Sequence, residues 1–169
     1  MEWVNSAGGP IVCGEECVCN SWLGIHGLSA AGSKTAANDY QRACECRNYV
    51  DILPCASGQI LVLGDEPLQS SFFIASDGVL SIARWVYSKN RDVEELLISS
   101  KLEFLEKNTP LSLPTGGRLG LFDSANVGAT SGYAKSRVSL SAGEYTVTTE
   151  RIKKEREHNF LIHRFLRAS

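Results

Sequence analysis

The sequence has no excess of basic charge and no long hydrophobic run. Its 17 lysines and arginines are outnumbered by 19 aspartates and glutamates, for a formal net charge of -2, whereas dedicated nucleic-acid-binding domains are usually basic. Its apolar runs are strand-sized and too short to cross a bilayer. The first residues have no basic region followed by an apolar stretch, so we expect no signal peptide. These absences predict a soluble, cytoplasmic protein that binds neither nucleic acid nor membrane.

A recognisable catalytic or phosphate-binding signature is also missing. The glycines of Gly8-Gly9-Pro10 and Gly116-Gly117 have the spacing neither of a dinucleotide fingerprint nor of a phosphate loop with its lysine, and we interpret them as turns or close packing. His26 falls in the same irregular region as the N-terminal cysteines, but no local signature supports a nucleophile-base pair there. We expect no catalytic residues and no cofactor. A small enzyme that uses Asp65 and Glu66, or His26, has no support beyond the presence of those residues.

Paired Cys-x2-Cys knuckles, which make a zinc site recognisable, do not occur either. Without an export signal the thiols should stay reduced, and buried free cysteine is common in proteins. We therefore expect unligated thiols and no metal site. The alternative hypothesis is a cysteine-based metal-binding or thiol-redox protein built on Cys13, Cys17, Cys19, Cys44, Cys46 and Cys55.

The sequence does contain enough apolar residues to build a core. Its hydrophobic fraction is 43% of 169 residues, which fits a single domain over residues 1–169. Apolar residues at helical spacing from Val93 to Leu105 predict one main helix at about residues 91–106. The remaining patterns are mostly strands, so we predict an α+β fold that is mostly β, with antiparallel sheets and that one main helix.

Turn signals separate the expected strands. Asp77-Gly78 between two apolar runs predicts a hairpin, because glycine accepts the positive φ that such turns need. The run Gln59–Leu63 lies between two glycines and predicts a buried strand. Residues 14–39 have little periodicity and predict a loop-rich excursion with one helical turn near 15–21. Further strands are expected at residues 118–122, 137–140, 145–150 and 160–165.

Several short motifs, each weak alone, occur in an order that resembles the immunity protein 21 family of bacterial polymorphic toxin systems. The resemblance spans nearly the whole chain, and its departures are the N-terminal cysteines and a Gly/Ala/Ser-rich stretch at 26–38. The motifs are Trp3-Val4-x-Ser6-x-Gly8-Gly9-Pro10-Ile11, Asp39-Tyr40-x-Arg42-Ala43-Cys44, Leu61-Val62-Leu63-Gly64-Asp65-Glu66-Pro67, Arg84-Trp85-Val86-Tyr87, Phe122-Asp123-Ser124-Ala125 and Gly143-x-Tyr145-x-Val147.

This resemblance implies a small cytoplasmic immunity protein without catalytic activity. Its partner would be a cognate protein toxin domain, which it would bind and block. The family is not defined by a catalytic set, so the resemblance carries over no active residues, and the oligomeric state stays open.

Candidate partner contacts follow from residue type and loop position. Trp22 lies in the irregular region, where a partly exposed tryptophan would anchor a partner, although the favoured interpretation is that it fills the core. Asp39, Asp65, Glu66 and Asp77 are acidic loop residues that would complement a basic toxin. The local pattern of Asp65 and Glu66 is typical of a loop that follows a strand, which is the favoured interpretation and leaves a binding contact open.

A charged link near the C-terminus, Lys153-Lys154-Glu155-Arg156-Glu157, leans basic. It would suit an acidic partner, but a run of mixed sign in a turn is usually a solvated surface. We interpret it as solvated surface.

Overall fold

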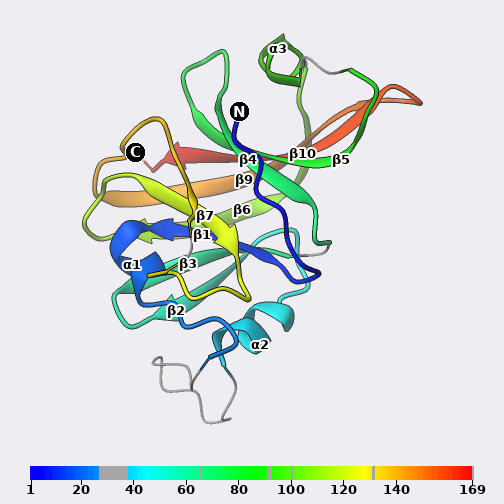
Figure 1. The fold of residues 1–169 in the computed structure, drawn as a ribbon. Coiled ribbons are helices and arrows are strands. Elements are labelled where there is room, and N and C mark those ends of the chain that lie inside the picture. The colour runs from blue at the N-terminus through cyan, green and yellow to red at the C-terminus, as the bar shows by residue number, and fades with distance from the viewer. Residues whose placement is uncertain (27–37, 65, 91–92, 100, 131, 169) are drawn as a thin grey trace.

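The computed structural model describes residues 1–26, 38–64, 66–90, 93–99, 101–130 and 132–168. Within these residues the chain forms two five-stranded antiparallel sheets (Figure 1). Sheet I, in strand order, contains β2 (Asp51–Cys55), β3 (Gly58–Leu63), β1 (Ile11–Glu15), β7 (Leu119–Asp123) and β8 (Ala134–Lys135). Sheet II, in strand order, contains β4 (Gln69–Ile74), β5 (Leu80–Ser88), β10 (His158–Arg167), β9 (Gly143–Lys154) and β6 (Glu103–Leu113).

Three short helices lie outside the sheets in the described part of the chain. They are α1 (Glu16–Asn20), α2 (Asp39–Cys44) and α3 (Val93–Ser99). In Figure 1, α1 and α2 lie on the side of sheet I, and α3 lies on the opposite side of the molecule, beside sheet II. None of the described helices is long and apolar enough to cross a membrane.

Strand β3 shows why the run Gln59–Leu63 is so apolar. Leu61 and Leu63 belong to the core between the two sheets. Ile60 and Val62 belong to a second core on the outer face of sheet I, which also contains residues of α1 and α2. Successive side chains of a strand point to opposite faces, so a strand that is covered on both faces is apolar at nearly every position.

A third core covers the outer face of sheet II. Val93 and Leu97 of α3 belong to it together with Phe160 of β10. The ring of Trp85 packs edge-on against Phe160, and Trp3 packs edge-on against Trp85, both with ring centroids 5.4 Å apart. The N-terminal segment thus helps α3 to cover sheet II.

The fold class predicted from the sequence is confirmed, because the described chain is mostly β with two antiparallel sheets and few helices. The predicted hairpin is β4–β5, and Gly78 in its turn has a φ of +81°. The buried strand at 59–63 is β3, and the predicted helical turn near 15–21 is α1. The motif Asp39–Cys44 forms α2.

The length of the predicted main helix is wrong. Helix α3 ends at Ser99, whose hydroxyl donates back to the Glu95 carbonyl at 2.8 Å. From Glu103 the chain is instead strand β6, paired with β9. Leu102 still packs against the outer core of sheet II. Helical spacing alone therefore does not show that the helix continues, because the partly buried Leu102 reaches the same core after the helix has ended.

The strand expected at 137–140 is wrong as well. Strand β8 is Ala134–Lys135, and Leu140 makes only an isolated bridge with Gly117. Most of the Gly/Ala/Ser-rich stretch at 26–38 lies outside the described residues.

Candidate functional site

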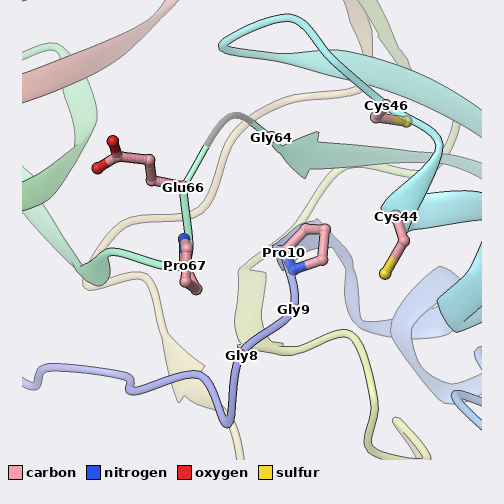
Figure 2. Close-up of a pocket in the computed structure, with 8 residues that line it drawn as sticks. All are labelled: Gly8, Gly9, Pro10, Cys44, Cys46, Gly64, Glu66 and Pro67. Atoms are coloured by element: carbon pink, nitrogen blue, oxygen red, sulfur yellow. The ribbon is translucent and has the colours of Figure 1, made fainter.

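Three loops that are far apart in the sequence meet at a cavity of about 230 Å³. They are the segment before β1, the end of α2 and the connection from β3 to β4, and Figure 2 shows them facing one another. Each loop contains part of one of the motifs described above, so we call this the signature cavity. It is lined by Gly8, Gly9, Pro10, Cys44, Cys46, Gly64, Glu66 and Pro67.

The wall between the first two loops depends on a glycine. A Cβ at Gly9 would lie 2.4 Å from Cε2 of Tyr40 in α2, so only glycine allows this contact. A capping box starts α2: the Asn38 side chain accepts from the Gln41 amide, and the Gln41 side chain accepts from the Asn38 amide. A hydrogen bond with the Cys44 side chain raises the pKa of Tyr40. The first loop and α2 therefore meet as one packed unit.

A buried aspartate at the end of β7 holds the segment before β1. The carboxylate of Asp123 accepts from the Ala7 amide at 2.7 Å and from the Ala125 amide at 2.9 Å. Next to it, the Ser124 amide donates to the Pro10 carbonyl at 3.1 Å. These bonds connect the motif at 122–125 to the first loop of the cavity.

A buried arginine of sheet II holds the third loop. Arg84 of β5 is only 1% exposed. Its Nη2 donates to the Gly64 carbonyl at 2.6 Å and also to the Glu66 carbonyl, and its Nη1 donates to the Tyr49 carbonyl at 3.4 Å. A guanidinium suits this task because it presents several donors in one rigid plane. Arg84 therefore positions the backbone that carries Glu66 at the rim of the cavity.

A buried histidine lies close enough to Arg84 for the guanidinium to affect its titration. His163 of β10 is fully buried, and its Nδ1 lies 3.1 Å from the Thr149 hydroxyl. Burial, and secondarily the positive charge of Arg84, lower the pKa of His163 well below its usual value. The imidazole is therefore neutral in the folded protein at pH values where an unfolded chain already binds a proton.

His163 should make the protein sensitive to acid. Below about pH 6.5 the unfolded chain binds a proton at this residue and the folded chain does not, so stability is lost as the pH falls, by up to about 1.4 kcal/mol per pH unit. In urea unfolding at pH 5 to 8, His163→Gln should lack this component, and above about pH 7 its profile should run parallel to that of the unaltered protein. His26→Gln, which changes an exposed imidazole, is the matched control. Parallel profiles down to pH 5 would contradict the assignment.

Two of the five nominated partner contacts are buried. Trp22 fills the core, the interpretation favoured from the sequence, because the side chain is 0% exposed and its Nε1 donates to the Ser124 carbonyl at 2.8 Å. Asp39 is 4% exposed, accepts from the Leu23 amide at 2.9 Å and pairs with Arg42 at 3.2 Å. Both side chains hold the chain around Trp22 and Leu23 in place and present almost no surface to a partner.

The other nominated acids do not gather at one place. Glu66 is exposed at the signature cavity, and in Figure 2 its carboxylate points away from Pro10 and Cys44. Asp77 lies in the β4–β5 turn, at the other end of β4, and pairs with Arg164. The six residues of β4 separate the two acids by roughly 20 Å at the usual rise of a strand. Asp65 lies outside the described residues.

The cysteines are distributed over three environments. Cys13 belongs to the core between the sheets, whereas Cys19 belongs to the outer core of sheet I. Cys17 is exposed beside Thr115, with 3.8 Å between Sγ and Oγ1. Among the described residues, no three His, Cys, Asp or Glu side chains come together as metal ligands. The cysteines therefore do not form the common site that the alternative hypothesis requires.

Burial also suppresses thiol chemistry at four of these positions. It raises the pKa of Cys13 well above its usual value, that of Cys19 to about 12, and those of Cys46 and Cys55 to about 11. Since the thiolate is the reactive form, these thiols should react slowly in the folded protein.

A thiol titration should therefore have two phases. Cys17 and Cys44 are exposed and should react rapidly with a chromogenic disulfide reagent, whereas the other thiols should need unfolding. The variant Cys17→Ser/Cys44→Ser should lose the rapid phase and keep the slow one. Equal rates for all six thiols in the folded protein, or a rapid phase that persists in Cys17→Ser/Cys44→Ser, would contradict this assignment.

Arg84 was recognised from the sequence only as part of a motif. Asp123 was interpreted as an aspartate that follows a strand and accepts from nearby amides, without its contact to the distant Ala7 amide. Arg84 had a usable signal, because a single arginine inside the apolar run Leu80–Val86 of a predicted strand has to find buried acceptors. Asp123 had a weaker signal, since an aspartate after a strand is common in turns.

Comparison with known proteins identifies the family. The family model described as Immunity protein 21 matches residues 2–158. The chain belongs to the immunity protein 21 family. The resemblance seen in the motifs is thereby confirmed, and the family name indicates an immunity protein with a toxin as its partner rather than an enzyme. No curated protein and no solved structure matches the chain.

The motifs of this immunity protein describe its framework. Arg84 and Asp123 hold loops, Gly9 allows close packing, and Trp3 and Trp85 stack on sheet II. Residues with such roles are needed whichever partner is bound. Selectivity for one partner therefore has to come from exposed side chains carried by this framework.

Proposed function

We propose that this protein neutralises the cognate toxin domain of a bacterial polymorphic toxin system. It acts in the cytoplasm as a single domain over residues 1–169. Binding places its surface over the active site or substrate groove of the toxin, without chemical change to either protein. The observation that carries the proposal is the match of residues 2–158 to the immunity protein 21 family.

The way the loops are held supports binding by a preformed surface. Buried Arg84 and Asp123 hold the loops of the signature cavity through backbone groups. A surface that is ordered before binding loses less conformational freedom on association, and more of the interaction energy then appears as affinity. Inhibition by occlusion requires such high affinity, because the inhibitor has to remain bound for as long as the toxin is present.

We place one partner contact at Asp65 and Glu66, on the loop that Arg84 holds. Trp22 and Asp39 contribute by supporting the framework, and Asp77 lies at the other end of sheet II. Alanine replacement of Glu66 is not expected to disturb the fold, because the side chain is exposed. An unchanged toxin affinity of Glu66→Ala would rule this contact out.

Co-expression tests the proposed function. The probe is a candidate cognate toxin domain, sought at the C-terminus of a protein encoded next to this chain and produced in a bacterial cell whose growth it arrests. We expect growth to be restored by this chain and not by an unrelated immunity protein expressed at the same level. Continued arrest in cells that contain the folded chain would refute the proposal.

A further inference from the structure

The hairpin between β9 and β10 projects from the body of the protein. Figure 1 shows it extending beyond the two sheets. Residues 153–157 at its end are all exposed, and the Lys89 amide at the end of β5 donates to the Glu157 carbonyl at 2.9 Å. We call residues 153–157 together with Lys89 the basic tip.

The basic tip has the opposite charge to the rest of the chain. It contains four cations, Lys89, Lys153, Lys154 and Arg156, and two acids, Glu155 and Glu157, for a net charge of +2. The whole chain carries -2, so the residues outside the tip carry -4. A positively charged patch on a protein of negative net charge creates an electrostatic potential that orients an approaching partner and speeds the encounter.

The basic tip is ordered by its own hydrogen bonds. Pairing of β9 with β10 continues to Lys154 opposite His158. The Glu157 amide donates to the Lys154 carbonyl at 3.0 Å, and the two side chains form an ion pair at 2.9 Å. The cations are therefore presented on a preformed turn.

Arg156 stands at the turn in an unfavourable conformation. Its φ is +61°, and among the described residues it is the one non-glycine residue with a positive φ. Glycine or asparagine adopts this region at lower cost. Strain of this kind is often retained at functional sites, and here it keeps a cation at the end of the hairpin.

Apolar surface lies beside the basic tip. Val86 and Tyr87, near the end of β5, are each 37% exposed. Tyrosine and arginine are the side chains enriched among residues that dominate binding energy. Gln69, at the start of β4, pairs with Trp85, near the end of β5. The loop before β4, which carries Glu66, therefore lies at the same end of sheet II as the basic tip.

We propose that the basic tip, with Tyr87 beside it, docks on an acidic surface of the toxin domain. This inference rests on the proposed function and extends its contact from the loop at 64–67 to the projecting hairpin. The cations of the tip steer the encounter with the acidic surface, and the tyrosine ring is buried once the two proteins meet.

Two variants and a matched control test the inference, with the purified toxin domain from the co-expression experiment as the binding partner. Lys153→Glu/Arg156→Glu should slow association about tenfold or more at low salt, and the effect should shrink at high salt. Arg156→Gly should weaken binding while its melting temperature stays equal or rises, because glycine relieves the strain. Arg118→Glu/Lys135→Glu makes the same change in net charge at exposed positions in or next to strands of sheet I, away from the tip, and should bind like the unaltered chain.

The outcomes separate this inference from the proposed function. Failure of the unaltered chain to bind the toxin domain would refute the proposed function and this inference with it. Normal binding by Lys153→Glu/Arg156→Glu, or an equal loss of binding in the control variant, would refute only the proposed role of the basic tip. Duplex DNA and anionic lipid vesicles are measured in parallel. Tip-dependent binding to either of them, with toxin binding unchanged, would also refute it.

Discussion

Replacing Trp22 with alanine should lower the free energy of unfolding of the isolated protein by about 3–5 kcal/mol. The side chain is fully buried in the outer core of sheet I, and its Nε1 donates to the Ser124 carbonyl. Alanine leaves a cavity among Val18, Ala43 and Phe122 and an unpaired carbonyl. Urea unfolding of the protein alone measures the loss.

Trp22→Phe serves as the matched variant for this prediction. It keeps an aromatic ring in the core and removes mainly the hydrogen bond, so it should retain much of the stability that alanine loses. A stable Trp22→Ala protein that no longer binds its toxin would contradict the structure, because that result is expected of an exposed contact residue and not of a buried one.

Replacing Arg84 with leucine should cost about 3–5 kcal/mol, because hydrogen bonds from a charged donor contribute about 1.5–3 kcal/mol each and their carbonyl acceptors would stay buried. The affected carbonyls belong to Gly64, Glu66 and Tyr49. The loop at 64–67 would lose its anchor, so toxin affinity should fall together with stability. Arg84→Lys should recover only part of the loss, since an ammonium group does not reproduce the planar fork.

Arg118→Leu is the control for Arg84. Arg118 is exposed at the start of β7, and a surface substitution of this kind is usually neutral within about 0.5 kcal/mol. Equal stability of Arg84→Leu and Arg118→Leu would contradict the assignment of Arg84 as the anchor of the third loop.

Structure determined by neighbouring residues was predictable from the sequence. The β4–β5 hairpin follows from Asp77-Gly78 between two apolar runs, and β3 follows from a short apolar run between glycines. In each case the signal and the structure involve the same few residues. The mostly β fold class follows from a series of such local patterns.

Structure determined by distant residues was not predictable. Leu102 and Leu105 fit helical spacing, but pairing with β9 takes the chain into β6 from Glu103. Leu140 has a strand-like neighbourhood, but it makes only an isolated bridge with Gly117. The decisive partners in both cases lie more than twenty residues away along the chain.

The candidate site shows the same limit. Its three loops were recognised as separate motifs, and only the fold brings them to one cavity. Asp39 was interpreted as an exposed loop residue, and Trp22 was kept as a candidate contact beside its favoured core-filling role, because the sequence does not show that α1 and α2 cover sheet I. The charged link at 153–157 was interpreted as solvated surface, and all five residues are exposed. Only the fold shows that they form the end of a projecting hairpin.

We propose that this protein acts by covering its partner. The most direct measurement titrates the purified toxin domain with the chain while the activity of the toxin is followed. We expect inhibition to become complete at an equimolar ratio and unaltered toxin to be recovered when the complex is dissociated. Loss of toxin activity at far less than equimolar chain, or full toxin activity in an excess of folded chain, would contradict it.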